Sequence, residues 1–574
     1  MSASYDCVIR GGRVADGTGA PLRTADVAIA DGRIVAVGPV AGRGTEEIDA
    51  SGLLVTPGFI DIHTHYDGQA TWESRLQPSS WHGVTTTVMG NCGVGFAPVR
   101  ASDRDMLVEL MEGVEDIPGI VLQEGIAWNW ESFADYLDVL ESRPRDMDLC
   151  AQIPHAALRL YVMGERAARL EPATDADMAA MRRLAADAVR AGAMGFSTSR
   201  SLNHQTSKGD PTYTLRASDE ELTAIAMGMS DAGAGVIEIV TDFGDDPAGH
   251  FEGLKQIVRA SGRPMSVVVV QKHSAPDAWR GLMEMVEQAN REGLPMRAQI
   301  APRAIGMLLG LEGSACPFSH LPKWKTIAGL PFEERLAKAR DPVFRAEVLA
   351  EAEAMPPQKP AEKYHTLYQM MFPLRDPPNY EPEAKDSVLE RAARAGVSPH
   401  EMAYDLMIAD GGKGFFLTTV INYADHTLDA CAEMIASDNA LISLSDGGAH
   451  VGLICDGSQP TFLLAHWGRD RNGRKFDLPL LVRRLTSDCA NAVGLADRGE
   501  IRPGMRADIN IIDFDRLQCE PPEIAYDLPS GAKRFRQRAK GYVATMVAGQ
   551  VTYREGEATG ALPGRLVRGS AAGV

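Results

Sequence analysis

The middle of this 574-residue sequence alternates short apolar segments with longer helical patterns. Eight apolar segments have the length of buried strands, and the stretches between them, such as 175–191, favour helices. Strands and helices that alternate in this way are typical of a parallel sheet covered by helices. Eight such units over roughly 400 residues predict an α/β fold built on a (β/α)8 TIM barrel with insertions. The predicted strands are 55–65, 83–91, 149–154, 193–199, 235–242, 265–271, 296–301 and 440–445.

Both ends of the chain carry short strands with tight turns. Near the N-terminus, Asp31-Gly32 joins the apolar runs 25–30 and 33–37 as a hairpin, and similar runs lie at 507–513 and 542–550. Each end alone has too few strands to be stable, so we expect the two ends to pair into one small β-sandwich. The predicted domains are 1–55 and 491–574 (β domain and C-terminal tail) and 56–490 (barrel).

About 140 residues separate the seventh and eighth predicted strands, at roughly 302–439. This stretch contains proline-rich breaks and a cluster of methionine and aromatic residues at 364–372. A connection of that length is usually a lid or an extra subdomain. We therefore expect a cap over the barrel mouth, meaning the carboxyl ends of the strands; surface decoration is the alternative.

Charge and cysteine content narrow the range of partners. The formal net charge of −19 argues against nucleic acid and anionic membranes as partners, because both need a basic face, and it does not exclude an anionic small-molecule substrate. The eight cysteines form no CxxC pair, the N-terminus does not read as a signal peptide, and no apolar run is long enough to span a membrane. We expect a cytoplasmic protein with free thiols. Oligomeric state has no signature in the sequence.

The strongest chemical motif is His63-Thr64-His65, at the end of the first predicted strand. Alternate side chains of a strand point the same way, so both imidazoles face inward at the barrel mouth, where barrel enzymes place catalysis. Two converging neutral imidazoles form half of a zinc site. The motif therefore predicts a metal centre.

Two further strand ends carry reactive groups. Cys92 follows the second predicted strand and lies between Gly90-Asn91 and Gly93. It is either a reactive thiol or a small buried apolar residue. Asp446 follows the eighth strand, where a carboxylate can bind metal and take a proton from a metal-bound water. We predict that Asp446 is catalytic, and a turn-forming Asp before Gly-Gly is the alternative.

Together these residues resemble the amidohydrolase superfamily, and more narrowly its N-acyl-D-amino-acid deacylase (D-aminoacylase) branch. The resemblance also covers 11–19, 192–198 and 498–508. It implies one or two Zn²⁺ ions, with Cys92 as a ligand in place of the strand-four lysine of other relatives. The fourth predicted strand ends Phe-Ser-Thr-Ser and has no lysine. The activity implied is hydrolysis of the linear amide of an N-acyl, D-configured amino acid, with Asp446 as the general base.

The sequence departs from that branch at strands five and six, where the branch has histidines. Strand five contains none, and the family position in strand six falls on Gln271. Three interpretations remain: Asp242 and His273 substitute as ligands, one metal binds to His63, His65, Cys92 and Asp446, or metal binding is lost.

Residues for substrate binding are less defined by the sequence. A basic side chain at the cap or mouth would hold a substrate carboxylate, and Arg159 and Arg303 are the candidates. His204 and His450 are candidate mouth residues, although a non-ligand role is common for such histidines. The alternative functions are a cyclic-amide hydrolase of the hydantoinase or dihydropyrimidinase type, and a non-catalytic scaffold with a degraded metal site.

Overall fold

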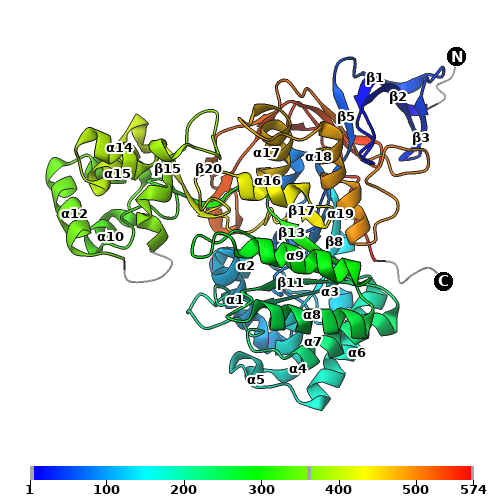
Figure 1. Cartoon of the computed structure of the whole chain (residues 1–574), viewed down its shortest axis with the longest axis horizontal. Helices are drawn as coiled ribbons and strands as arrows, with labels where there is room; N and C mark the ends of the chain where they lie inside the picture. The colour runs from blue at the N-terminus through cyan, green and yellow to red at the C-terminus, as the bar shows by residue number, and fades with distance from the viewer. Residues whose placement is uncertain (1–4, 358–362, 570–574) are drawn as a thin grey trace.

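The computed structural model describes residues 5–357 and 363–569; the remaining parts of the predicted β domain and insertion lie outside the described residues. Figure 1 shows three regions: strands from both chain ends together at one corner, a helical lobe that extends to one side, and a larger α/β body. Most of the predicted site residues lie in the α/β body. The order of its strands therefore decides which of these residues lie close together.

The α/β body contains parallel strands in chain order. Three of them form one sheet, β6-β7-β8, and six form another, β9-β10-β11-β12-β13-β17. Only Gln152 separates β8 from β9, and Thr64 bridges Gly447 in parallel beyond the ends of β6 and β17. The strands are β6 (Phe59–Asp61), β7 (Val84–Met89), β8 (Asp148–Ala151), β9 (Ile153–Pro154), β10 (Gly195–Arg200), β11 (Val236–Thr241), β12 (Met265–Val268), β13 (Met296–Ile300) and β17 (Ala440–Ile442).

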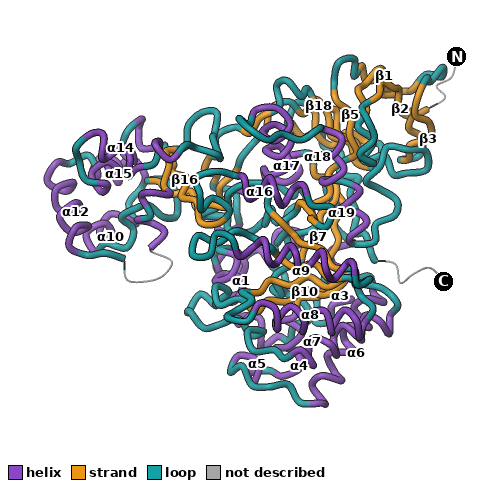
Figure 2. Tube along the Cα trace, in the orientation of Figure 1, coloured by secondary structure: helices purple, strands orange, loops and turns teal. Residues whose placement is uncertain are grey.

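Helices connect these strands and have clear local start and stop signals. Thr174 and Asp177 form a capping box at the start of α6 (Asp175–Ala191), and Ser218 caps α7 (Asp219–Ala232). Gly233 then ends α7 in the left-handed conformation. The other helices of this body include α1 (Arg104–Glu115), α4 (His155–Met163), α8 (Pro247–Ser261), α9 (Ala278–Arg291), α16 (Asp429–Ala436), α18 (Leu478–Leu485) and α19 (Ser487–Ala492). Figure 2 shows α8 and α9 running alongside the strands.

Both chain ends contribute to one sheet. Its strand order is β25-β24-β23-β18-β5-β1-β2-β3, with β4 also pairing β1. The antiparallel pair β5–β18 joins the two ends of the chain. Buried aliphatic side chains from both ends, among them Val27, Ile29 and Ile509, share one core. The strands are β1 (Tyr5–Val14), β2 (Arg23–Ala30), β3 (Arg33–Gly38), β4 (Gly44–Asp49), β5 (Leu54–Pro57), β18 (Ile509–Ile512), β23 (Tyr542–Val547), β24 (Gln550–Arg554) and β25 (Glu557–Ala558).

The first predicted strand, 55–65, is two strands in the structure. β5 belongs to the sheet of the chain ends and β6 to the α/β body, with Gly58 between them. A Cβ at Gly58 would lie 2.1 Å from the hydroxyl oxygen of Thr85, so only glycine allows this close crossing. The apolar run was continuous in the sequence, and the turn inside it depends on a contact with β7.

The lobe lies between β13 and β17 in the chain. Its antiparallel strands pair in the order β14-β16-β15, and its side chains form a separate core that includes Trp324, Phe344 and Tyr404. The elements are β14 (Ile305–Gly310), β15 (Met371–Pro373), β16 (Phe415–Ile421), α10 (Pro322–Ala328), α11 (Phe332–Ala339), α12 (Pro342–Ala354), α14 (Val388–Ala395) and α15 (Pro399–Ile408). After the lobe, α16 packs against both β13 and β17, so the chain is back in the α/β body before the last strand.

Candidate metal centre

His63 and His65 follow the end of β6 and point to the same side of the chain. Between them, Thr64 turns the other way and its hydroxyl lies 2.7 Å from that of Thr87 on β7. The imidazoles of both histidines are fully buried. Burial lowers the pKa of both, because it disfavours the charged ring. The two rings are therefore neutral, which is the form that binds a metal ion.

Cys92 is held beside His63 by a strained turn at the end of β7. Its φ of 55° is in the left-handed region, which is uncommon for a residue with a side chain. The backbone N–H of Cys92 donates a 3.0 Å hydrogen bond to Oε2 of Glu238. This turn places Sγ of Cys92 3.3 Å from Nε2 of His63. Burial raises the pKa of the thiol, so a cation is needed to stabilise its thiolate form.

Asp446 approaches both histidines from the segment after β17. Its Oδ1 lies 3.4 Å from Nε2 of His63 and 3.6 Å from Nε2 of His65. Burial favours the neutral acid, but the attraction of His65, His63 and His450 in their protonated forms outweighs it and lowers the pKa of Asp446 below its usual range. Asp446 also adopts a left-handed φ of 49°, directly before Gly447. The carboxylate of Asp446 therefore lies close to Nε2 of both imidazoles.

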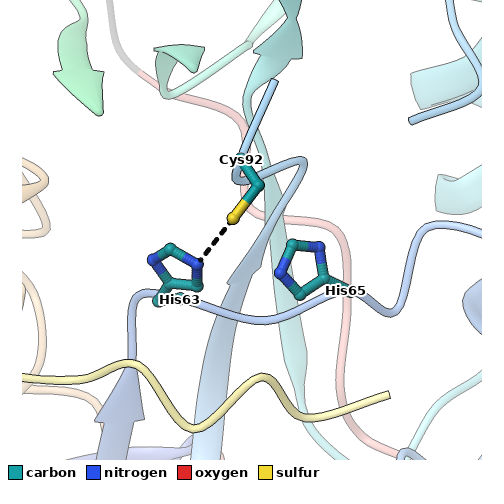
Figure 3. A group of neighbouring side chains, drawn as sticks. All are labelled: His63, His65 and Cys92. Atoms are coloured by element: carbon teal, nitrogen blue, oxygen red, sulfur yellow. Dashed lines mark hydrogen bonds between the residues drawn. The ribbon is translucent and has the colours of Figure 1, made fainter. Parts of the chain in front are cut away.

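Figure 3 shows His63, His65 and Cys92 with their polar atoms facing one another. One ligand atom from each of these residues lies within 4.8 Å of the others, so the three could hold a metal ion. Neither ring nitrogen of His65 has a hydrogen-bond partner, although both are buried. A buried polar group without a partner is costly, and a bound cation would satisfy Nε2. Two imidazoles, one thiolate and one nearby carboxylate are ligand types that zinc prefers.

Asp242 and His273 lie outside this three-residue group. The carboxylate of Asp242 accepts hydrogen bonds from the hydroxyl of Ser201 and the backbone N–H of Leu202, and it pairs with Lys272 at 3.4 Å. Burial lowers the pKa of His273, His426 adds to this shift and Asp425 opposes it, and no residue of the metal group contributes.

Gln271, at the expected histidine position of strand six, is also occupied elsewhere. Its side-chain amide donates to Asp425 at 3.1 Å, and its side-chain oxygen accepts from the backbone N–H of Ala424 at 3.0 Å. The structure therefore joins the strand-six position to the segment after β16 and not to the metal group.

Three buried side chains near the metal group were missed by the sequence analysis. Gln299 accepts a 2.7 Å hydrogen bond from Nδ1 of His63, Glu238 holds the backbone of Cys92, and Glu115 lies 3.5 Å from Nδ1 of His65. Glu238 had a sequence signal, because it lies inside the apolar strand Val-Ile-Glu-Ile-Val. A glutamate in such a strand is buried, and a buried glutamate almost always has a partner. Glu115 had none, because a glutamate in a stretch with other acidic residues carries no local sign that it is buried.

The site is acidic as well as buried. Burial raises the pKa of Glu238 to about 8 and that of Glu115 well above its ordinary value, and the charge of Asp446 adds to both shifts. A divalent cation among these groups would oppose the shifts, because it favours the ionised carboxylates. The electrostatics of the site thus fit the ligand geometry.

A sequence profile of the amidohydrolase family matches residues 46–553. The chain belongs to the amidohydrolase family. Among curated relatives, the D-aminoacylase of Alcaligenes xylosoxydans xylosoxydans is 32% identical over 273 residues, which are 47% of this chain and 51% of that protein. The matched region therefore spans about half the length of this relative.

Two solved structures share the fold of this amidohydrolase over nearly its whole length. A D-aminoacylase structure, described for the functional role of its binuclear metal centre, has a TM-score of 0.65 and 23% identity, and covers 98% of this chain and 100% of its own. The N-acyl-D-glutamate deacylase of Bordetella bronchiseptica, in complex with zinc and a phosphonate inhibitor, has a TM-score of 0.64 and 22% identity, and covers 98% and 99%. These likenesses show an α/β fold that contains a TIM-type barrel.

The two arginines predicted to bind substrate are both buried in ion pairs of this amidohydrolase. Arg159 pairs with Glu221 at 2.8 Å and donates to three backbone carbonyls. Arg303 pairs with Asp456 at 2.6 Å and lies 3.9 Å from the ring centre of Tyr380. Their guanidinium groups are thus already neutralised by carboxylates.

The two predicted mouth histidines lie close to the metal group. Burial lowers the pKa of His204 to about 4, and the neighbouring His65 and His450 add to the shift. Its Nδ1 lies 2.8 Å from the hydroxyl of Ser199 at the end of β10. His450 lies with its Nε2 3.6 Å from Oε2 of Glu115. The structure thus brings both histidines to the site and keeps His204 neutral.

Among the described residues, no helix has both the length and the apolar character that crossing a membrane requires.

Proposed function

We propose that this amidohydrolase cleaves the amide bond of N-acyl amino acids of D configuration, using a metal-activated water. The observation that carries the proposal is the convergence of His63, His65 and Cys92 with the carboxylate of Asp446. The amide class and the D configuration are supported by the similarity to D-aminoacylase and to N-acyl-D-glutamate deacylase.

We assign one Zn²⁺ ion to His63, His65, Cys92 and Asp446. A zinc ion bound there would lower the pKa of a bound water and polarise the amide carbonyl. A single ion is favoured because Asp242 is already bonded to the loop after β10, and Gln271 and His273 face the segment after β16. Neither strand five nor strand six then supplies a second set of ligands.

Asp446 is the general base in this proposal. A cation bound at the site would keep this carboxylate ionised, so it can accept a proton from the attacking water. The same carboxylate can then return the proton to the nitrogen of the leaving amine. Because the side chain of Asp446 is 16% exposed, it reaches the mouth while the two histidines stay buried.

His204 and His450 are our candidates for contacts with the substrate. Both lie beside the metal group, and each imidazole can form hydrogen bonds through its ring nitrogens. Arg159 and Arg303 fit the role less well, since a substrate carboxylate would have to compete with Glu221 or Asp456.

We infer that β6 to β17 close into a complete (β/α)8 barrel. The continuity of β8 with β9 and the bridge between Thr64 and Gly447 support closure at both seams. On this architecture, 56–490 form the barrel and 302–439 its cap, while 1–55 and 491–574 supply a small β-sandwich and the C-terminal tail. The separate core of the lobe and the shared sheet of the chain ends support these divisions.

The experiment is a substrate panel with zinc-loaded and chelator-treated protein. Amine release is measured from N-acetyl-D-amino acids and their L enantiomers, and ring opening of a hydantoin and of dihydrouracil is followed by the appearance of the N-carbamoyl product. We expect hydrolysis of D substrates that is lost on chelation and restored by zinc. Cleavage of the ring substrates alone would assign the cyclic-amide alternative, and a chain that retains no zinc and cleaves nothing would be a scaffold.

A further inference from the structure

Glu115 is a buried acid at the edge of the metal group with no assigned role. It is the last residue of α1 and only 2% exposed. Its carboxylate lies between two imidazoles: Oε1 is 3.5 Å from Nδ1 of His65, and Oε2 is 3.6 Å from Nε2 of His450. A helix from a distant part of the sequence thus delivers a carboxylate to the outer side of a metal-site histidine.

The facing atoms of His65 and Glu115 both lack a hydrogen-bond partner. Nδ1 of His65 and Oε1 of Glu115 are both buried, and neither has a hydrogen-bond partner at normal distance. One is a potential donor and the other an acceptor. A small approach of these two atoms would satisfy both groups at once.

The tautomer of His65 decides which of its nitrogens needs an acceptor. Nε2 faces Oδ1 of Asp446, and hence the side where the metal ligands converge. A neutral imidazole that uses Nε2 as a ligand carries its proton on Nδ1. That proton points toward Glu115. His63 follows the same logic with a different partner, since its Nδ1 donates to the neutral amide oxygen of Gln299 at 2.7 Å.

The backbone keeps Glu115 in this place. The N–H of His450 donates a hydrogen bond to the carbonyl of Glu115. Asp116 then leaves the helix in the left-handed conformation, with φ 51°. Two residues before Glu115, a Cβ at Gly113 would meet the backbone of Gln205 and Thr206 at 2.2 Å. The backbone at the end of α1 is therefore fixed in the fold, and it holds Glu115 beside His65.

We propose that Glu115 is a positioning residue: it accepts the Nδ1 proton of His65 and orients that ring for metal binding. This rests on the metal site of the proposed function, but not on the substrate assigned there. A carboxylate in this outer position fixes the ring and raises its basicity. Loss of such a partner typically weakens metal binding by about 10- to 100-fold.

The test compares the zinc affinity of the full-length wild type with Glu115→Gln and Glu115→Ala, by competition with a chromophoric chelator. We expect Glu115→Ala to weaken binding by about 10- to 100-fold, and Glu115→Gln to weaken it less, because an amide oxygen still accepts the proton. Glu221→Gln is the matched control: Glu221 is also a buried acid paired with a histidine, His155, but it lies outside the metal group. Its zinc affinity should equal that of the wild type.

The visible spectrum of the Co²⁺-substituted proteins gives a second readout that a merely structural role would not move. We expect an altered ligand-field band for both Glu115 variants and an unaltered one for Glu221→Gln. Wild-type zinc affinity and spectrum in folded Glu115→Gln and Glu115→Ala would overturn the proposal; if Glu115→Ala does not fold, Glu115→Gln decides. A wild type that binds zinc but cleaves no N-acyl amino acid would refute the proposed substrate and leave the role of Glu115 standing.

Discussion

Oδ1 of Asp446 lies 3.4 Å from Nε2 of His63, although one residue follows the last parallel strand and the other follows the first. The backbones of the two segments also meet: the N–H of Asp446 donates to the carbonyl of His63, and that of His65 donates to the carbonyl of Gly447. The contact between the segments that follow the first and last strands thus also brings the proposed general base to the metal ligands.

Replacing Asp446 by Asn should abolish most of the hydrolysis and leave the fold intact. An amide cannot take the proton from the attacking water, and general-base catalysis contributes about 10²- to 10⁴-fold. We therefore expect kcat for the best N-acyl-D-amino acid to fall by that factor. Asp242→Asn, which changes a carboxylate outside the metal group, is the control. A kcat for Asp446→Asn within tenfold of the wild type would contradict the assignment of the base.

Cys92→Ser should weaken zinc binding by more than about tenfold, because a hydroxyl is a far poorer ligand than a thiolate. In the Co²⁺-substituted protein, the thiolate-to-cobalt charge-transfer band of the wild type should disappear in this variant. Cys150→Ser is the matched control, since Cys150 is a buried free cysteine on β8. A charge-transfer band that persists in Cys92→Ser would place the metal elsewhere.

Asp242→Ala and His273→Ala should each leave the zinc content at one ion per chain. The reason is that neither side chain belongs to the group of converging ligand atoms. Elemental analysis after dialysis against buffer measures the content directly. Two ions in the wild type and one in either variant would show instead that these residues build a second site.

His82 should make the free energy of unfolding depend on pH. Its ring is buried and lies 2.7 Å from the hydroxyl of Thr461 and 3.0 Å from the carbonyl of Gln537. Burial lowers its pKa to about 4, whereas an unfolded histidine titrates near 6.5. Between these values the unfolded chain binds more protons, so stability is complete above pH 6.5 and falls as the pH drops toward 4.

The shift corresponds to about 3 kcal/mol of stability at neutral pH. Urea unfolding of wild type and His82→Gln at pH 7, 5.5 and 4 tests this. We expect the difference in free energy of unfolding between the two proteins to shrink by up to about 3 kcal/mol on going from pH 7 to pH 4. The other histidines are common to both proteins, so their contributions cancel in this difference. A difference that is constant with pH would exclude His82 as the source.

Local sequence patterns predicted much of this protein. The alternation of apolar segments with helical ones predicted the parallel strands: six of the eight predicted ranges overlap parallel strands over more than half of their length, and 440–445 does so over half. The first range was only partly right, because a tertiary contact at Gly58 splits it between two sheets. The spacing of His63 and His65 correctly placed both rings on one side, since side-chain direction in extended backbone depends only on neighbouring residues.

Other features have no local signal in the sequence. Asp242 and His273 stood at plausible strand ends, but the loop after β10 and the segment after β16 give them other partners. Arg159 and Arg303 had the right charge for a substrate carboxylate, yet each is buried against an acid from a different element. A sequence lists such charges without saying which of them pair.

The sequence by itself determined the elements and the ligand types: the strands, the capped helices, the paired histidines, and a cysteine and an aspartate at strand ends. Tertiary structure alone decided which of these groups meet. It placed Glu115 beside His65, Glu238 beside Cys92 and Gln299 beside His63. The physical reason is that strand and helix periodicity follow from neighbouring residues, whereas the partner of a buried polar atom depends on how distant elements pack.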